Sequence, residues 1–218
     1  SDNGVDWTAQ ATNLTGYEMH NLICSYTDSL WMIVSSLSDD TYHLAQSYDG
    51  KDWRVLSDPL PDDFPVTGFA VTTFMSESFR ERTLLVGGYD RFGNILNTRW
   101  SAEMTYAGVR WINYTVGRNE FRYLAGAQII AYNDMLLMFG GIDENNNLQS
   151  TTIWQSEDEG MTWTEADSTK NVLPVTLSPR YRHSMLVGKD SNIYIVGGRS
   201  LSDFFTDCHR GRLASIDY

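Results

Sequence analysis

Short apolar runs separated by polar turns dominate the hydrophobic pattern of this 218-residue chain. Four of these runs, LWMIV, TLLV, LLMF and IYIV, each end at a pair of small residues: Ser35–Ser36, Gly87–Gly88, Gly140–Gly141 and Gly197–Gly198. Runs of this length bounded by Gly, Asp and Asn indicate buried strands, and no long segment shows a helical period. The pattern therefore predicts an all-β protein.

The same pattern repeats along the chain. The small-residue pairs recur at intervals of 52, 53 and 57 residues. A tryptophan that follows a polar turn recurs as Trp7, Trp53, Trp111 and Trp163, at intervals of 46, 58 and 52 residues. Each interval holds four short apolar or alternating segments, and a four-stranded unit repeated at about 50 residues is typical of a β-propeller blade.

The repeat predicts how the chain is organised. We expect one antiparallel β-propeller domain over residues 1–218 with four blade-equivalents. The expected blades are 15–58, 59–118, 119–172 and, without its fourth strand, 173–218, and residues 1–14 would supply a closing strand. The alternative is that the chain is an open piece of a larger ring of about six to eight blades.

The glycine pairs, and the segment RYRHSMLVGKDSNIYIVGG at 180–198 above all, resemble those of kelch-type, galactose-oxidase-like propellers. The wider sequence is similar to uncharacterised secreted propeller proteins of Bacteroides-type bacteria. In each blade, the loop between the second and third strands and the connection to the next blade lie on one face, which we call the loop face. The kelch resemblance implies that ligands bind on this face. The turns between first and second and between third and fourth strands form the opposite, turn face.

The segment SEDEGMTW resembles the Asp-box, S-x-D-x-G-x-T-W, of sialidase-like propellers. This resemblance implies a structural role for Ser156, Asp158, Gly160, Thr162 and Trp163. The hydroxyl and the carboxylate would bind backbone groups of the turn, the glycine would take a positive φ, and the indole would pack into the blade interface. We therefore expect this carboxylate to stabilise a turn on the turn face and to take no part in chemistry.

Net charge limits the partners of this chain. With 16 basic and 28 acidic residues the net charge is −12, which repels phosphate backbones, so we expect no nucleic acid partner. No apolar run reaches 18 residues, so we expect no membrane insertion. The resemblance to secreted propellers implies an extracytoplasmic location, with any export signal outside this chain, whereas the alternative is an intracellular adaptor of the kelch class.

No catalytic or metal-binding motif stands out. The four histidines lack metal-ligand spacing, and the arginines and cysteines lack the contexts of sialidases and of copper-dependent galactose oxidases. Cys24 and Cys208 are expected to be buried free thiols, and the alternative is a disulfide between them if the chain ends meet. We expect no cofactor, no metal and no catalytic residue; an enzyme remains the alternative, with His183, Asp90 and Asp143 as its acid and base candidates.

Arginine and aromatic side chains gather before the first strand of three expected blades. These candidate ligand-binding residues are Tyr17, His20, Arg122, Tyr123, Arg180, Tyr181, Arg182 and His183. Arg122–Tyr123 and Arg180–Tyr181 lie 18 and 17 residues before their glycine pairs, which indicates equivalent positions. Planar cations beside aromatic faces suit a ligand rich in acceptor groups.

The function predicted from these observations is a non-catalytic binding module that takes a carbohydrate or a protein at its loop face. Three alternatives stay open. The arginines would instead bond to neighbouring blades, the domain would be a glycan-active enzyme of glycosidase or oxidase type, or it would be a purely structural part of a larger secreted protein.

Overall fold

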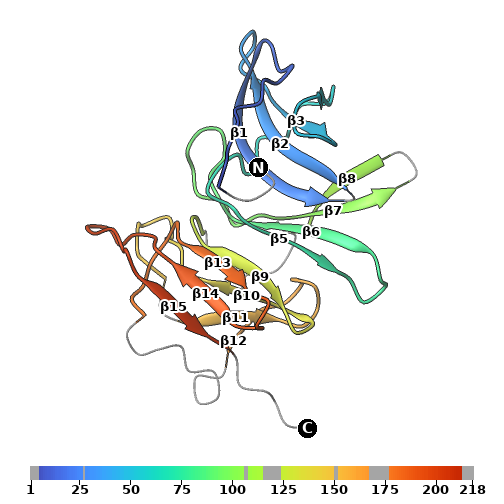
Figure 1. Cartoon of the computed structure of the whole chain (residues 1–218). Helices are drawn as coiled ribbons and strands as arrows, with labels where there is room; N and C mark the ends of the chain where they lie inside the picture. The colour runs from blue at the N-terminus through green and yellow to red at the C-terminus, as the bar shows by residue number, and fades with distance from the viewer. Residues whose placement is uncertain are drawn as a thin grey trace. The chain divides into compact units, whose positions relative to one another are not determined.

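The computed structural model describes residues 5–26, 28–105, 108–114, 124–149, 152–166 and 177–212. All regular structure in these residues is β-strand, arranged in four antiparallel sheets (Figure 1). No helix that could cross a membrane occurs in them. The predicted all-β architecture of short antiparallel strands is thus confirmed. The chain divides into two compact units, Ser1–Pro61 and Asp62–Tyr218, which we describe separately.

The first unit contains one four-stranded sheet in which each strand pairs with the next. Its strands are β1 (Tyr17–Tyr26), β2 (Ser29–Ser36), β3 (Tyr42–Ser47) and β4 (Trp53–Val55). Val34, Ala45 and Trp53 are the centre of its apolar cluster. Residues 5–14 are the described part of the expected closing strand; they form no strand, and the Trp7 side chain is 79% exposed.

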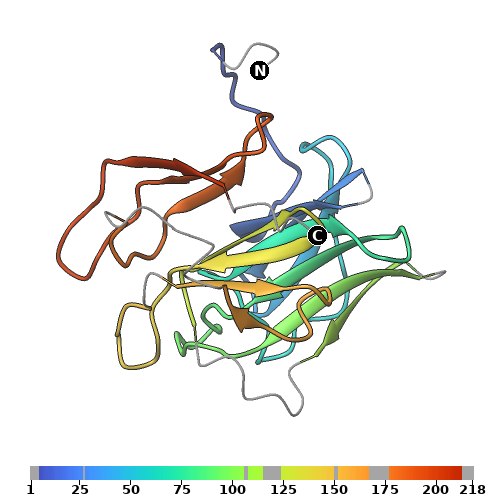
Figure 2. The same cartoon turned by 90° about the horizontal axis from the view of Figure 1, so that it is seen from below.

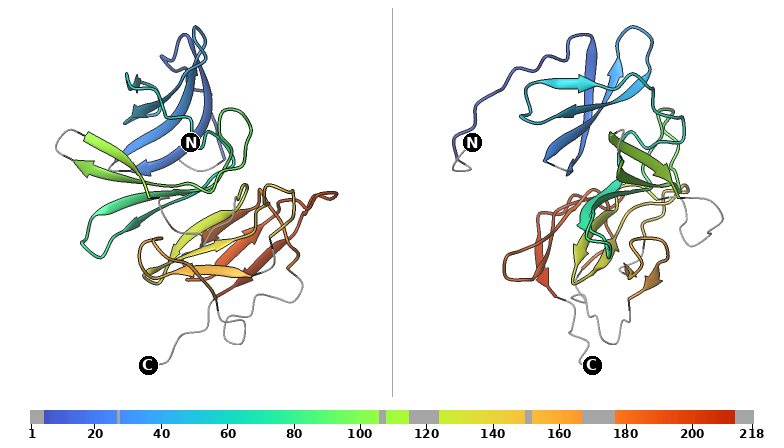
Figure 3. Two further views of the ribbon diagram at one scale, coloured as in Figure 1. Left: turned by 180° about the vertical axis from the view of Figure 1, so that it is seen from behind. Right: turned by 90° about the vertical axis from the view of Figure 1, so that its right-hand side faces the viewer.

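The second unit contains three further sheets with the same strand-to-strand order (Figures 2 and 3). The first holds β5 (Ala70–Met75), β6 (Glu81–Val86), β7 (Arg99–Thr105) and β8 (Gly108–Asn113), and the second β9 (Gln128–Tyr132), β10 (Met135–Phe139), β11 (Ile153–Ser156) and β12 (Thr164–Glu165). The third holds three described strands, β13 (Ser184–Val187), β14 (Ile193–Val196) and β15 (Cys208–Gly211). Strand β9 lies between β5 and β13, so the first strands of the three sheets are neighbours.

Strand β10 shows why the apolar runs are continuous rather than alternating. Leu136 and Met138 pack with the buried side chains of β5 and β6, whereas Leu137 and Phe139 pack with Ile193 and its neighbours on β14. Successive side chains of a strand point to opposite faces of its sheet. A sheet that is covered on both faces therefore needs apolar residues at every position.

The glycine pairs let each sheet of the second unit approach the next. The second glycine donates a backbone hydrogen bond to the segment that leads into the following sheet, from Gly88 to Leu124 O (2.7 Å) and from Gly141 to Arg180 O (2.9 Å). A Cβ atom on the first glycine, Gly87 or Gly140, would collide with the same carbonyl oxygen. The repeated glycines thus serve close packing between sheets.

Candidate functional site

Three lead-in segments of the second unit, residues 66–69, 124–127 and 180–183, precede β5, β9 and β13 and share one backbone arrangement. In each, the second residue pairs with the residue that follows the glycine pair: Thr67 with Tyr89, Ala125 with Ile142, and Tyr181 with Arg199. The third residues are linked in series, because Gly126 N donates to Gly68 O and Arg182 N donates to Gly126 O, both at 2.7 Å. These hydrogen bonds define equivalent positions.

Arg182 departs from this repeat. Gly68 and Gly126 have φ angles of +65° and +72°, and Arg182 has a φ of +55° at the equivalent position. Glycine reaches this left-handed region without penalty, whereas a long side chain there is strained. An exposed arginine is therefore held where the two preceding sheets use glycine, and strain of this kind is concentrated at functional sites.

Arg199 departs from the repeat as well. It takes the position of Tyr89 and Ile142, and Phe204 takes the position of Ile95 and Leu148 as its bridge partner. The guanidinium carbon of Arg199 lies 5.5 Å from the ring centre of Tyr181 and 4.8 Å from that of Phe204. The guanidinium carbon of Arg182 lies 5.9 Å from the Tyr181 ring. We call Tyr181, Arg182, Arg199 and Phe204 the arginine–aromatic cluster.

The two cations of the cluster are not neutralised by the described part of the chain. No Asp or Glu carboxylate among the described residues forms an ion pair with Arg182 or Arg199. Phe204 is 76% exposed, so its ring is open to a ligand. Ring contacts orient the guanidinium groups without occupying all of their hydrogen-bond donors. Two available cations beside an exposed ring can bind an acidic group attached to an apolar surface.

Arg180, also expected at the ligand site, is instead part of the core. Its side chain is fully buried and donates to both carboxylate oxygens of Asp207, at 2.6 and 2.9 Å, and to Gly197 O at 2.8 Å. It lies over the Phe205 ring as well. The hydrogen bonds from Arg180 hold the pKa of Asp207 far below its usual value. These side-chain bonds stay within the repeat that contains β13–β15. They therefore differ from the alternative expectation, in which the arginines bond to a neighbouring blade.

His183 is likewise buried, with 3% of its surface exposed. Its ring meets the Phe139 ring edge-on at 5.2 Å, and neither ring nitrogen has a hydrogen-bond partner among the described residues. Burial, followed by the charge of Arg180, lowers the pKa of His183 to about 4, so the ring is neutral at neutral pH. A histidine enclosed in this way does not reach a ligand at the surface.

The other expected ligand residues lie elsewhere. Arg122 and Tyr123 fall outside the described residues, and their expected equivalence to Arg180 and Tyr181 is wrong, because Leu124 O and Arg180 O accept the equivalent bonds from Gly88 and Gly141. The turn between β13 and β14 is longer than that between β9 and β10, so counting back from the glycine pairs misaligns the two segments.

Tyr17 and His20 belong to the first unit, on β1. His20 Nε2 lies 2.8 Å from Ser35 Oγ, and its ring stacks on Tyr42 with centres 5.1 Å apart. The ring of Tyr17 meets that of His43 edge-on at 6.3 Å. These residues form a ring cluster of their own.

The turn at residues 156–163 binds its own backbone. Asp158 accepts hydrogen bonds from Thr162 N (2.7 Å), Thr162 Oγ1 (2.6 Å) and Ser156 Oγ (2.9 Å), and Trp163 Nε1 donates to Gly160 O (3.1 Å). Burial raises the pKa of Asp158, but the hydrogen bonds outweigh burial and lower it. The turn from Ser47 to Trp53 repeats the arrangement, with its carboxylate supplied by Asp49.

The two aspartates that the enzyme alternative names as acid and base candidates also accept hydrogen bonds from their own loops. One carboxylate oxygen of Asp90 accepts from the backbone of Phe92 and Asn94, and Asp143 does the same for Asn145 and Asn147. Both side chains are buried. Each of these aspartates therefore organises the loop that follows its glycine pair.

Sequence reasoning missed Arg199 and Phe204, although a signal was present. The residues after the glycine pairs read GGYD, GGID and GGRS, so an arginine stands where the other repeats place an apolar side chain. Cys208 is free, as expected, but exposed rather than buried, and the side chain of Cys24 lies outside the described residues. No group of three potential metal ligands occurs in the described part of the chain.

Comparisons with known proteins identify the fold. No curated protein matches this chain. A solved structure titled "Structure of YjhT" aligns at 17% sequence identity with a TM-score of 0.56, over 78% of this chain and 50% of that one. The chain thus spans about half the length of this structural neighbour, and the similarity shows the fold alone. Because residues 1–218 match the family described as DUF6242 beta propeller domain, the predicted propeller is confirmed and the chain belongs to that family.

Proposed function

We propose that this domain is a non-catalytic binding module that takes an acidic carbohydrate at its loop face. The observation that supports the proposal is the arginine–aromatic cluster: two guanidinium groups without a carboxylate partner in the described residues, next to the exposed ring of Phe204. Three residues of the cluster, Tyr181, Arg182 and Arg199, replace small or apolar residues of the equivalent repeats. Side chains that break a repeat at some strain are better explained by a ligand than by packing.

The chemistry of the cluster favours a carbohydrate with a carboxylate or a similar acidic group. A planar guanidinium binds a carboxylate through two parallel hydrogen bonds. An exposed phenyl ring packs against the apolar face of a sugar. A stable protein interface needs about 800 Å² from each partner, and a cluster of four side chains supplies far less. A carbohydrate is therefore favoured over a protein ligand at this position.

Binding without turnover is supported by the state of the acid and base candidates. The carboxylates of Asp90 and Asp143 accept hydrogen bonds from the backbone of their own loops, and His183 is buried beside Phe139. A glycosidase needs two carboxyl groups that flank the scissile bond. None of these three residues is placed for that task near the cluster.

We also propose that the domain works outside the cytoplasm, on the strength of its acidic, aromatic-rich composition and its resemblance to secreted propellers. The full reading frame tests this directly. An export signal upstream of the domain is expected. A frame that joins the domain to an intracellular oligomerisation module would contradict the proposal.

A glycan array that contains both acidic and neutral sugars tests the binding function. Two variants take the residue of an equivalent position, Arg199→Ile (as in Ile142) and Arg182→Gly (as in Gly126), so both should fold. We expect binding to acidic glycans by the natural protein and its loss in each variant. Arg54→Gln, which removes an exposed cation from β4, serves as the control for net charge. Turnover of glycosidase substrates that disappears in His183→Ala would contradict the proposal.

A further inference from the structure

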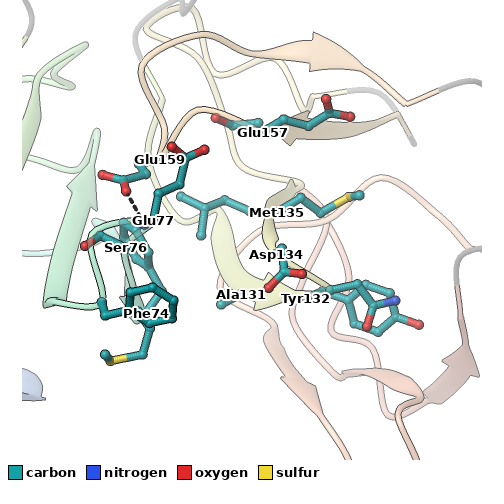
Figure 4. Close-up of a pocket in the computed structure, with 14 residues that line it drawn as sticks. Phe74, Ser76, Glu77, Ala131, Tyr132, Asp134, Met135, Glu157 and Glu159 are labelled. Atoms are coloured by element: carbon teal, nitrogen blue, oxygen red, sulfur yellow. Dashed lines mark hydrogen bonds between the residues drawn. The ribbon is translucent and has the colours of Figure 1, made fainter.

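A cleft of about 570 Å³ opens on the turn face of the second unit, opposite the loop face. Its walls come from the hairpin turn between β5 and β6, the turn between β9 and β10, and the turn after β11. Figure 4 shows Phe74, Ser76 and Glu77 on one side and Ala131, Tyr132 and Asp134 on the other. Clefts of this size commonly hold small molecules or short peptide segments.

Apolar side chains line the cleft and remain exposed at its edge. Met75 is 63% exposed and Phe79 is 89% exposed. Phe79 also has a φ of +55°, an outlier for a bulky residue, in a turn where asparagine or glycine would be unstrained. A phenyl ring held in water by a strained backbone has no packing role in the described structure, which points to a contact surface.

Carboxylates surround the apolar lining. Glu77, Asp134 and Glu157 line the cleft, are exposed, and form no ion pair within the described residues. Glu159 accepts a hydrogen bond from Glu77 N at 2.8 Å and pairs with Arg82 at 3.0 Å. Among the described residues, none that lines the cleft is a lysine or an arginine, and Arg82 is engaged by Glu159 and Glu103. The cleft therefore attracts cations.

We propose that this cleft is a second binding site, which takes an extended segment of a partner protein carrying lysine or arginine next to apolar side chains. In an extended chain, successive side chains point in opposite directions, so apolar residues can face the lining while basic residues reach the rim. Three exposed carboxylates that come from three separate turns and have no ion-pair partner among the described residues favour several basic side chains over a single small cation. The site is independent of the arginine–aromatic cluster, which attracts ligands of the opposite charge.

Fluorescence polarisation with a labelled peptide of alternating lysine and leucine tests the proposal, with the matched glutamate–leucine peptide as the probe control. We expect the lysine peptide alone to bind. The triple variant Glu77→Gln/Asp134→Asn/Glu157→Gln should weaken its binding about tenfold, because each surface ion pair contributes modestly. A triple variant that removes the same charge elsewhere, Glu18→Gln/Asp52→Asn/Glu144→Gln, should bind as the natural protein does.

The Phe79→Asn variant separates the site from general stability. Asparagine tolerates the backbone conformation of Phe79, so the melting temperature should rise or stay constant while peptide binding weakens. Four outcomes would overturn the proposal: no binding of the lysine peptide up to about 1 mM, equal binding of the glutamate peptide, equal loss in both triple variants, or unchanged binding in Phe79→Asn. Self-association of the protein that the cleft variant abolishes would assign the cleft to a second copy instead.

Discussion

The Arg180 guanidinium and the Asp207 carboxylate form two parallel hydrogen bonds, 2.6 and 2.9 Å long, although Arg180 is fully buried and the Asp207 side chain is 38% exposed. Leu124 occupies the position equivalent to Arg180, so an ion pair replaces apolar packing in the last sheet. His209 Nε2 lies 2.8 Å from the second oxygen of the same carboxylate. The pair therefore joins the lead-in segment 180–183 to the start of β15.

Removing one partner of this pair should be costly. Asp207→Ala leaves the Arg180 charge buried without its carboxylate, and we expect a loss of about 3–5 kcal/mol in unfolding free energy. Thr98 is the counterpart of Asp207, because their carbonyl oxygens accept equivalent backbone bonds from Gly87 N and Gly197 N. The double variant Arg180→Leu/Asp207→Thr takes the residues at positions 124 and 98 and should recover most of that loss. Urea unfolding of the three proteins measures both effects. Asp207→Ala unfolding at the same urea concentration as the natural protein would mean that the pair is not needed.

His183 should make stability depend on pH between about 6.5 and 4. Burial lowers its pKa in the folded state from the ordinary histidine value of 6.5 to about 4, so the unfolded chain binds the proton first as pH falls. Its contribution is complete above pH 6.5 and is lost as pH falls toward 4, on the order of 5–10 °C in melting temperature.

The variant His183→Phe takes the residue at the equivalent position 69. Its melting temperature should be nearly independent of pH in this window. The hydrogen bonds that lower the pKa values of Asp158 and Asp207 move their titration below this range. A His183→Phe protein that loses the same number of degrees between pH 6.5 and 4 would rule out this histidine as the cause.

The turn carboxylates should contribute to stability and not to binding. Asp158→Ala and Trp163→Ala remove turn hydrogen bonds and packing, and each should cost roughly 1–4 kcal/mol in unfolding free energy. Asp49→Ala provides the matched change in the first unit, where the carboxylate makes equivalent bonds. Denaturation measures the loss, and glycan binding of the folded variants should be unchanged. Binding lost at a constant melting temperature would indicate a functional turn.

Arg182→Gly should stabilise the fold. The variant removes a long side chain from a positive φ at a position where Gly68 and Gly126 are unstrained, and a gain of about 0.5–1 kcal/mol in unfolding free energy is expected. Chemical denaturation measures this gain. A variant less stable than the natural protein would show that Arg182 is held for packing rather than for a ligand.

Much of the fold was predictable because it depends on local patterns that repeat. Glycine pairs and continuous apolar strands such as β10 indicate that sheets pack closely against each other, and both features recur along the chain. The site was harder to predict, since RYRH at 180–183 places neighbouring residues in different environments: Arg180 and His183 point into the core, whereas Arg182 is exposed. Arg199 reaches the site through a backbone bridge that no local pattern reveals.

The turn-face cleft illustrates a second limit. Its lining comes from three turns more than 20 residues apart in sequence, each of which resembles an ordinary polar turn by itself. Only the packing of β5 beside β9 brings Phe79, Asp134 and Glu157 around one opening. Sequence reasoning that follows a repeat finds shared structure and overlooks surfaces made between repeats.

The most direct test of the central claim is isothermal titration of a galacturonic acid oligosaccharide into the natural protein and into the Arg182→Gly/Arg199→Ile variant. We expect the natural protein to bind the acidic oligosaccharide with an affinity that weakens as salt is raised, because the contact is between guanidinium and carboxylate groups. We expect no detectable binding by the variant at an unchanged or higher melting temperature, and no binding of the neutral galactose oligosaccharide. Equal binding by both proteins, or binding that does not distinguish the acidic from the neutral sugar, would contradict the claim that the arginine–aromatic cluster is the ligand site.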